Sequence, residues 1–130
     1  MAAHIVTSFD EELGEIDRLM HEMGELARAM VADATRALFE SDTALAQRVV
    51  SEDALMDAHQ RELDERAITI IAKRQPMAQD LRVVVGAIRM AVDFERIGDL
   101  AKNIASGSAL SAKASRQRAC RIRSTSWRSW

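Results

Sequence analysis

The feature that most constrains the fold is a run of apolar residues near the N-terminus, spaced alternately four and three residues apart. Side chains at this spacing fall on one side of an α-helix, and that side packs against neighbouring helices. Two further leucines, Leu19 and Leu26, widen the apolar side. The run consists of Phe9, Leu13, Ile16, Met20, Met23, Ala27, Met30, Ala34 and Ala37. The sequence therefore predicts a long first helix that belongs to a bundle.

A second helix is predicted after residues 41–43, Ser-Asp-Thr, because these residue types cap helix N-termini. The same spacing of threes and fours then returns in Ala46, Val49, Asp53, Met56, Gln60, Leu63, Ala67 and Ile70. Two members of this line, Asp53 and Gln60, are polar. A carboxylate on the interior side of a helix is unfavourable unless a partner balances its charge. Asp53 is therefore the first residue whose position calls for an explanation.

The third helix is predicted from about Pro76 to about Ala105. Proline disfavours helix in the residue before it and suits the first helical position. Asp80 then lies near the positive end of the helix, and Ser106 and Gly107 are expected to end it.

This helix carries two apolar lines on roughly opposite sides. The first consists of Val83, Ala87, Met90, Phe94, Ile97, Ala101 and Ile104, and the second of Leu81, Val84, Ile88 and Val92, with Glu95 and Asp99 continuing it. A helix that is apolar on two sides is normally buried on two sides. Two partner helices leave part of this surface uncovered, so we expect a further partner on the second line, and a second copy of the chain is the commonest kind.

Composition supports an all-α fold of one domain. The 130 residues include three Phe, two Trp, no Tyr, one Pro and five Gly, and Ala, Leu, Met, Arg and Glu favour long helices. We predict an antiparallel three-helix bundle over residues 4–106. Residues 107–130 hold six basic residues and no acid, which leaves twelve basic residues against twenty acidic ones in residues 1–106.

The basic tail, residues 107–130, has no helical apolar period. Its Trp127 and Trp130 beside arginines are compatible with binding to nucleic acid or anionic lipid. A disordered or frame-shifted terminus explains the abrupt change of composition better. An acidic body without a basic stripe is a poor nucleic-acid binder, so we expect no nucleic-acid partner.

The chain has neither the start of a secretory signal nor a membrane span, since its longest uncharged apolar run, residues 83–88, is too short to cross a bilayer. A single cysteine, Cys120, excludes an internal disulfide and an all-Cys metal site. We expect a soluble cytoplasmic protein that does not insert into the membrane.

Two acidic pairs could bind a metal ion: Asp53 with Asp57, and Glu95 with Asp99. The carboxylates of each pair lie one helical turn apart, where like charges destabilise a helix and a bound cation would reverse that effect. Oxygen ligands without Cys or a nearby His favour a hard ion such as magnesium, manganese or iron over zinc. Acidic residues at this spacing are also common on solvated helices, but the place of Asp53 in an interior line favours a site.

No catalytic constellation is present. The sequence lacks a Gly-rich phosphate loop and a Glu-x-x-His motif, and its three histidines, His4, His21 and His59, are scattered. His21 followed by Glu22 is weakly similar to the phosphoacceptor start of a histidine-kinase helical hairpin. We therefore expect a protein that is not an enzyme.

Residues 74–82, RQPMAQDLR, and 93–105, DFERIGDLAKNIA, strongly resemble the PhoU family. The acidic element DALMD at 53–57 and the opening at 9–20 are also similar to the family, so the resemblance covers about residues 3–105. It implies the first of two similar three-helix bundles, in which Asp53, Asp57, Glu95 and Asp99 match motifs that hold divalent or ferric metal clusters in some members.

The resemblance also implies a function. PhoU proteins repress phosphate-starvation signalling when phosphate is plentiful, and are thought to link the ATPase subunit of the phosphate ABC transporter to a sensor histidine kinase. We therefore expect a non-enzymatic, metal-binding adaptor that acts as a homodimer. Two alternatives remain: a purely structural helical module that binds no metal, and a histidine-kinase-type dimerisation and phosphotransfer domain that uses His21.

Overall fold

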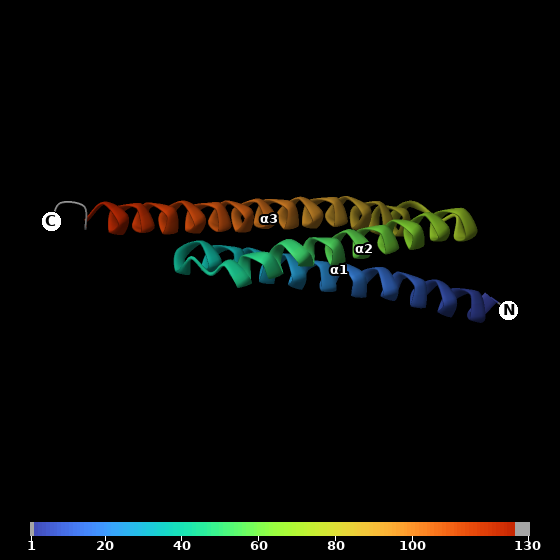
Figure 1. The fold of residues 1–130 in the computed structure, drawn as a ribbon. Coiled ribbons are helices and arrows are strands. Elements are labelled where there is room, and N and C mark those ends of the chain that lie inside the picture. The colour runs from blue at the N-terminus through green and yellow to red at the C-terminus, as the bar shows by residue number, and fades with distance from the viewer. Residues whose placement is uncertain (1, 127–130) are drawn as a thin grey trace.

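The computed structural model describes the backbone of residues 2–126 and the side chains of residues 8–107 and Arg116. It consists of three helices, α1 (Ala2–Glu40), α2 (Thr43–Arg74) and α3 (Ala78–Ser126). Each helix packs against the other two, and α2 runs antiparallel to α1 and α3 (Figure 1). The predicted antiparallel three-helix bundle is confirmed. None of the described helices is long and apolar enough to cross a membrane.

The connection between α1 and α2 has the cap that the sequence predicts. Ser41 adopts a left-handed conformation with φ 53°, and the backbone N–H of Asp42 donates a hydrogen bond of 3.1 Å to the carbonyl of Ala37. The side chain of Asp42 accepts a hydrogen bond of 3.0 Å from the backbone N–H of Leu45. These bonds satisfy backbone groups that both helix ends would otherwise leave unpaired.

The connection between α2 and α3 is formed around Gln75, whose φ of 44° is also left-handed. Its backbone N–H donates a hydrogen bond of 3.2 Å to the carbonyl of Ile71. α3 begins at Ala78, two residues after the predicted start at Pro76. Asp80 lies in the first turn of α3 as predicted, where its negative charge is favourable.

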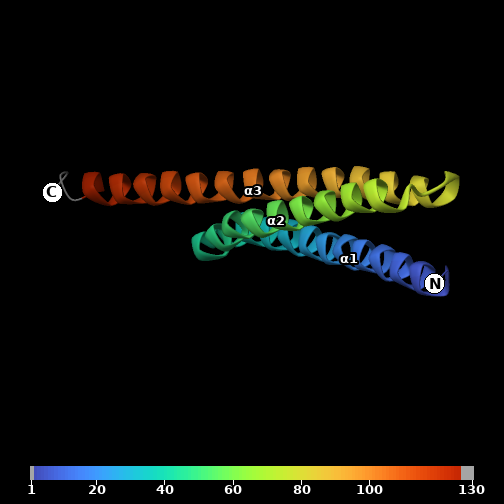
Figure 2. The same ribbon diagram turned by 90° about the vertical axis from the view of Figure 1, so that its right-hand side faces the viewer.

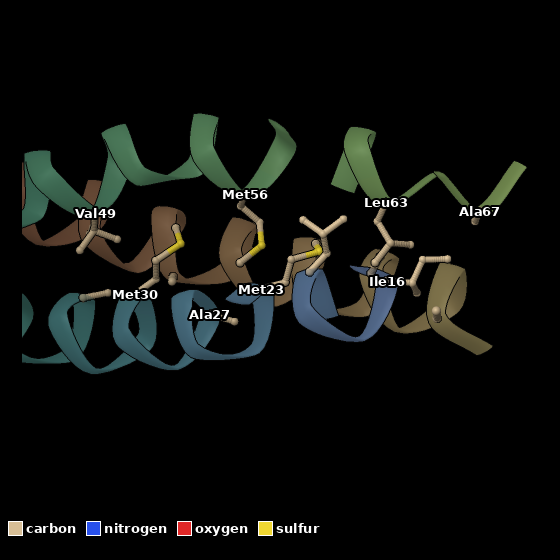
Figure 3. Close-up of a cluster of buried hydrophobic side chains, with 14 of the residues drawn as sticks. Ile16, Met23, Ala27, Met30, Val49, Met56, Leu63 and Ala67 are labelled. Carbon is tan, nitrogen blue, oxygen red and sulfur yellow. The ribbon is translucent and has the colours of Figure 1, made fainter. Parts of the chain in front are cut away.

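The core is formed by the apolar lines predicted for the first two helices. From α1 it buries Ile16, Leu19, Met23, Ala27, Met30, Ala34 and Ala37, and from α2 Leu45, Ala46, Val49, Met56, Leu63, Ala67 and Ile70. Figure 3 shows the side chains of Met23, Met30 and Met56 converging between the helices. The methionines therefore fill the core, as their place in the repeat indicates.

The buried face of α3 differs from the prediction. It consists of Val84, Ala87, Ala91, Gly98, Ala101 and Ala105, a line that runs between the two predicted ones. The physical reason is close packing: α3 touches α1 and α2 at once, and small residues occupy the line of closest approach. At Gly98, for example, an added Cβ would lie 3.4 Å from Cγ of Met56 and 3.7 Å from Sδ of Met30.

The larger apolar side chains of α3 flank that line. Val83, Met90, Ile97 and Ile104, seven residues apart, are exposed by 50%, 46%, 38% and 39%. In the line predicted to seek a partner, Val84 is fully buried, and Ile88 packs partly buried against the core. Leu81 of the same line is 37% exposed, so the second line is covered only in part, and most of the uncovered apolar surface lies on the other flank.

The end of α3 also differs from the prediction. The helix continues through Ser106 and Gly107 to Ser126, because no proline follows and one glycine in a helix costs only about 1 kcal/mol. Figures 1 and 2 show this last part, in red, projecting beyond the α1–α2 connection with neither helix beside it. Trp127 and Trp130, and the side chains of His4 and Cys120, lie outside the described residues. The division of the chain after residue 106 stays a prediction.

Candidate metal site

The four predicted acidic residues lie on two adjacent helices. Asp53 and Asp57 belong to α2, and Glu95 and Asp99 to α3. Asp53 is buried in the interior line, with 7% of its surface exposed, as its position in the sequence predicts. Asp57, Glu95 and Asp99 are half-buried beside it.

Asp53 has one partner and one unpartnered oxygen. Its Oδ2 accepts a hydrogen bond of 3.0 Å from Nζ of Lys102 on α3. Its Oδ1 is buried and has no hydrogen-bond partner. A buried carboxylate oxygen without a donor is unfavourable, so this atom is suited to accept a hydrogen bond or to bind a cation.

The pKa of Glu95 responds to the other three carboxyl groups. Burial raises the pKa of Glu95 above its usual 4.5, and a hydrogen bond with Asp99 and the charge of Asp99 raise it further. The charges of Asp57 and Asp53, on the other helix, act in the same direction. Like charges disfavour ionisation only when they are close. Glu95 is therefore close enough to the other three carboxylates for their charges to act on it.

The same cluster also raises the pKa of Lys102, which favours the charged form of this lysine. Its hydrogen bond to Asp53 and the charge of that carboxylate raise the pKa of Lys102, and Asp99 and Asp57 add to the effect. Sequence reasoning missed this residue. Its spacing could have identified it, because Lys102 follows Asp99 by three residues and Glu95 by seven and so lies on the same side of α3.

The cluster offers oxygen ligands only. Within the described part of the chain, no three Asp, Glu, His or Cys side chains stand close enough together to hold a metal ion without moving. The unpartnered Oδ1 of Asp53 and the mutual repulsion of the carboxylates nevertheless fit a hard cation, which would require side chains of the cluster to rotate on binding. The residues therefore match such an ion in chemistry, although their present rotamers do not form a finished site.

Two more buried carboxylate oxygens without partners were not predicted, Oδ1 of Asp64 and Oε2 of Glu52. Both residues belong to α2. The other oxygen of Glu52 lies 3.6 Å from Nε of Arg48, so this carboxylate has a cation of its own. Neither residue belongs to the cluster of four acids that the sequence identified.

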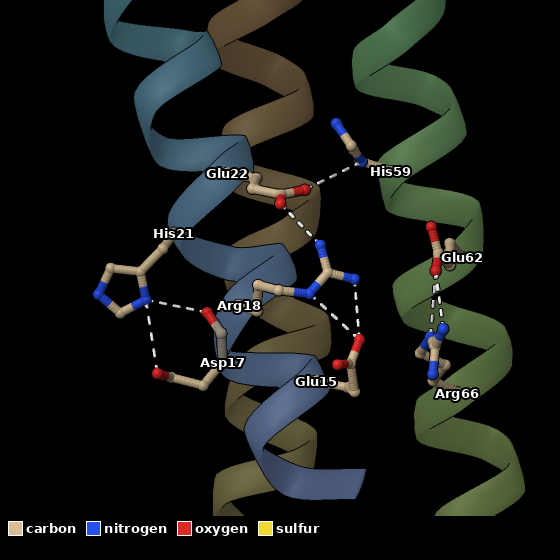
Figure 4. A network of polar contacts seen from close by, with 8 residues as sticks. All are labelled: Glu15, Asp17, Arg18, His21, Glu22, His59, Glu62 and Arg66. Carbon is tan, nitrogen blue, oxygen red and sulfur yellow. Dashed lines mark hydrogen bonds and ion pairs between the residues drawn. The ribbon is translucent and has the colours of Figure 1, made fainter. Parts of the chain in front are cut away.

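A separate polar network joins α1 to α2 (Figure 4). Arg18 lies 2.8 Å from Glu15 and 2.6 Å from Glu22, and Nδ1 of His59 lies 3.9 Å from Glu22. His21 faces solvent, with 77% of its side chain exposed, and its Nδ1 lies 2.9 Å from the backbone carbonyl of Asp17. Exposed ion pairs of this kind contribute little to stability.

A groove of about 460 Å³ between α1 and α2 is lined by Glu12, Glu62, Glu65, Arg66, Thr69 and Ile70. None of the four clustered carboxylates lines it. Arg74 spans the same pair of helices and donates hydrogen bonds to Ser8 at 2.9 Å and to Glu12 at 3.2 Å. We interpret these contacts as structural links between α1 and the end of α2.

Comparison with known sequences identifies close relatives. A PhoU domain matches residues 20–107. A phosphate-specific transport system accessory protein PhoU homolog from Rhizobium meliloti (strain 1021) is 57% identical over 103 residues, covering 79% of this chain and 44% of that protein. A PhoU homolog from Caulobacter vibrioides is 43% identical over 104 residues, covering 80% of this chain and 45% of that protein. The chain thus spans less than half the length of these relatives.

Comparison with solved structures identifies a PhoU protein as well. The crystal structure of PhoU from Pseudomonas aeruginosa superposes with a TM-score of 0.80 at 35% sequence identity, over 82% of this chain and 51% of that chain. The bundle therefore has the fold of about half of a PhoU protein. With more than half of its residues matched by the domain and with the bundle shared, the chain belongs to the PhoU family.

Proposed function

We propose that this chain is a non-enzymatic regulator of phosphate-specific transport. The observation that carries the proposal is the PhoU match over residues 20–107, together with relatives named as accessory proteins of that transport system. The family resemblance supports repression of phosphate-starvation signalling when phosphate is plentiful. Its partners would be the ATPase subunit of the phosphate ABC transporter and a sensor histidine kinase, on the cytoplasmic side of the membrane.

The adaptor works through a metal site. Asp53, Asp57, Glu95 and Asp99 would hold one or more divalent or ferric ions, with iron, magnesium and manganese as the candidates. A bound cation would supply positive charge that neutralises the cluster and links α2 to α3. The buried, unpartnered Oδ1 of Asp53 supports this role.

The chain also forms a homodimer. The supporting observation is the exposed apolar flank of α3, Val83, Met90, Ile97 and Ile104, whose seven-residue spacing suits helix pairing. A second copy that covers this flank would remove apolar surface from water.

The function is tested in bacteria that lack their own PhoU, with a reporter of phosphate-starvation genes in phosphate-rich medium. Expression of the chain is expected to lower the reporter signal, and tagged chain is expected to retain the transporter ATPase subunit from extracts. A full-length relative serves as the positive control. A chain that is stably expressed, yet neither lowers the reporter nor retains the ATPase, would contradict the proposal.

The histidine phosphotransfer alternative has weaker support. His21 is exposed, but no further motif of a phosphotransfer domain follows it in the sequence. The alternative of a purely structural module differs from the proposal in one measurable property, the response of the bundle to metal ions.

A further inference from the structure

Lys102 lies against the acidic cluster from the α3 side. Its Nζ donates a 3.0 Å hydrogen bond to Oδ2 of Asp53 across the α2–α3 interface. Within residues 8–107, no other cationic side chain forms an ion pair with Asp53, Asp57, Glu95 or Asp99. This one ammonium group therefore cannot neutralise all four carboxylates.

The two oxygens of Asp53 are in different situations. Oδ2 accepts a hydrogen bond from Lys102, whereas Oδ1 is buried and has no hydrogen-bond partner. A metal ion that drew on both oxygens, or that came close to Oδ2, would meet the ammonium group at short range. Two cations at contact distance repel each other strongly in a partly buried site. A metal ion that draws on Oδ2 of Asp53 and the ammonium group in its present position therefore exclude each other.

The ammonium group of Lys102 can move into solvent. The Lys102 side chain is 40% exposed, whereas the Asp53 side chain is only 10% exposed. Its long aliphatic stem can carry the ammonium group into solvent without disturbing the core. Release of the lysine therefore requires no repacking of α2 against α3.

We propose that Lys102 is a built-in counter-ion that competes with metal for Asp53, so that metal binding at the cluster releases its ammonium group. The inference rests on the proposed metal site and adds a side chain that regulates metal binding there. In the metal-free chain Lys102 holds α2 and α3 together at Asp53. In the metal-bound chain the metal ion does so, and Lys102 becomes a free surface cation.

The first test compares Mn²⁺ binding by titration calorimetry in Lys102→Met, Lys102→Arg and the matched control Lys73→Met. Lys73 is an exposed lysine in the last turn of α2, roughly 30 Å along the helix from Asp53. Loss of a partly exposed ion pair predicts that Lys102→Met binds Mn²⁺ about threefold more tightly than the wild type. Lys102→Arg, which keeps the charge, and Lys73→Met should match the wild type.

The second test uses the unaltered chain, so it does not depend on how a variant folds. The rate of Nζ acetylation at each lysine is measured by mass spectrometry with and without Mn²⁺. Lys102 is expected to react faster when Mn²⁺ is bound, and Lys73 is expected not to change.

The outcomes separate the two claims. If Mn²⁺ binds while the reactivity of Lys102 stays constant, or if Lys102→Met binds Mn²⁺ no more tightly than the wild type, the counter-ion role is wrong and the metal site stands. If neither the wild type nor any variant binds Mn²⁺, the metal site is wrong and the inference is overturned with it.

Discussion

Glu95 has a carboxyl group that the fold keeps protonated to a higher pH than usual. Its pKa is raised above 4.5, so the folded state holds the proton more tightly than the unfolded state does. As pH rises from about 4.5 through the folded-state pKa, this group therefore lowers the free energy of unfolding. At neutral pH the ionised Glu95 destabilises the metal-free bundle.

Replacement of Glu95 by Gln is expected to remove that penalty. In the presence of a chelator, Glu95→Gln should unfold at a higher urea concentration than the wild type at pH 7, and the difference should vanish near pH 4.5. Asp93→Asn, on an exposed residue of the same helix, serves as the control and should show no such trend. A difference between Glu95→Gln and the wild type that is constant across this pH range would contradict the role of Glu95.

Asp53 and Lys102 show what could and could not be predicted about the site. The burial of Asp53 follows from its place in a strict repeat of threes and fours, and the structure confirms it. The partnership with Lys102 depends on the reach of a flexible side chain across two helices. The local sequence of α2 shows only that Asp53 needs a partner, and the signal for Lys102 lies on α3, in its spacing from Glu95 and Asp99.

Among the helices, α3 depends most on close packing. Gly98 lies between Glu95 and Asp99, and an added Cβ would come within ordinary contact distance of Met56 and Met30. Gly98→Ala is therefore expected to fit, and to stabilise the helix by up to about 1 kcal/mol. Gly98→Leu would overfill this space and cost about 1–3 kcal/mol. It would also move α3 away from Asp53 and Asp57.

Chemical denaturation of the two variants measures this packing. Equal stability of Gly98→Ala and Gly98→Leu would mean that α3 does not approach α2 as closely as described. A loss of stability in Gly98→Ala would mean the opposite, that α3 approaches Met56 and Met30 more closely than described. Far-UV circular dichroism checks that both variants keep their helices.

The exposed flank of α3 gives a prediction about association. Ile97→Glu places a charge on this apolar surface without touching the core. Sedimentation at high micromolar concentration is expected to show self-association of the wild type and a shift toward monomer in Ile97→Glu. A wild type that sediments as a clean monomer would contradict the homodimer.

The helices differ in how well the sequence predicted them. In α1 and α2 the core positions hold mostly large apolar residues, so spacing alone identified the buried side. In α3 alanine and glycine occupy the buried line except at Val84, and the other large apolar residues lie beside it. A prediction based on large apolar residues therefore chose the wrong positions in α3. The short distance between the helices favours small residues at that interface. The predicted end of the helix at Ser106 and Gly107 was wrong because a glycine permits a helix to end there but does not force it to end.

For the whole molecule, the last part of α3 is expected to be dispensable for the bundle. It projects beyond the other helices (Figure 1), so a chain that ends at Gly107 should unfold with a free energy within about 0.5 kcal/mol of the full chain. Its helical signal in circular dichroism should fall, since residues 108–126 are helical in the full chain. A lower Tm after truncation would show that this segment supports the bundle.

Thermal unfolding with and without Mn²⁺ tests most directly the proposed metal site of four carboxylates from two helices. A hundredfold excess over the dissociation constant is expected to stabilise the wild type by about 2.7 kcal/mol, a rise in Tm of roughly 10 °C. The double variant Asp57→Asn, Asp99→Asn should melt at or above the metal-free wild type and show no further rise with Mn²⁺. The control Asp80→Asn, Asp93→Asn alters two exposed acids and should respond as the wild type does. A wild type that does not respond to Mn²⁺, or a double variant that responds equally, would contradict the proposed metal site.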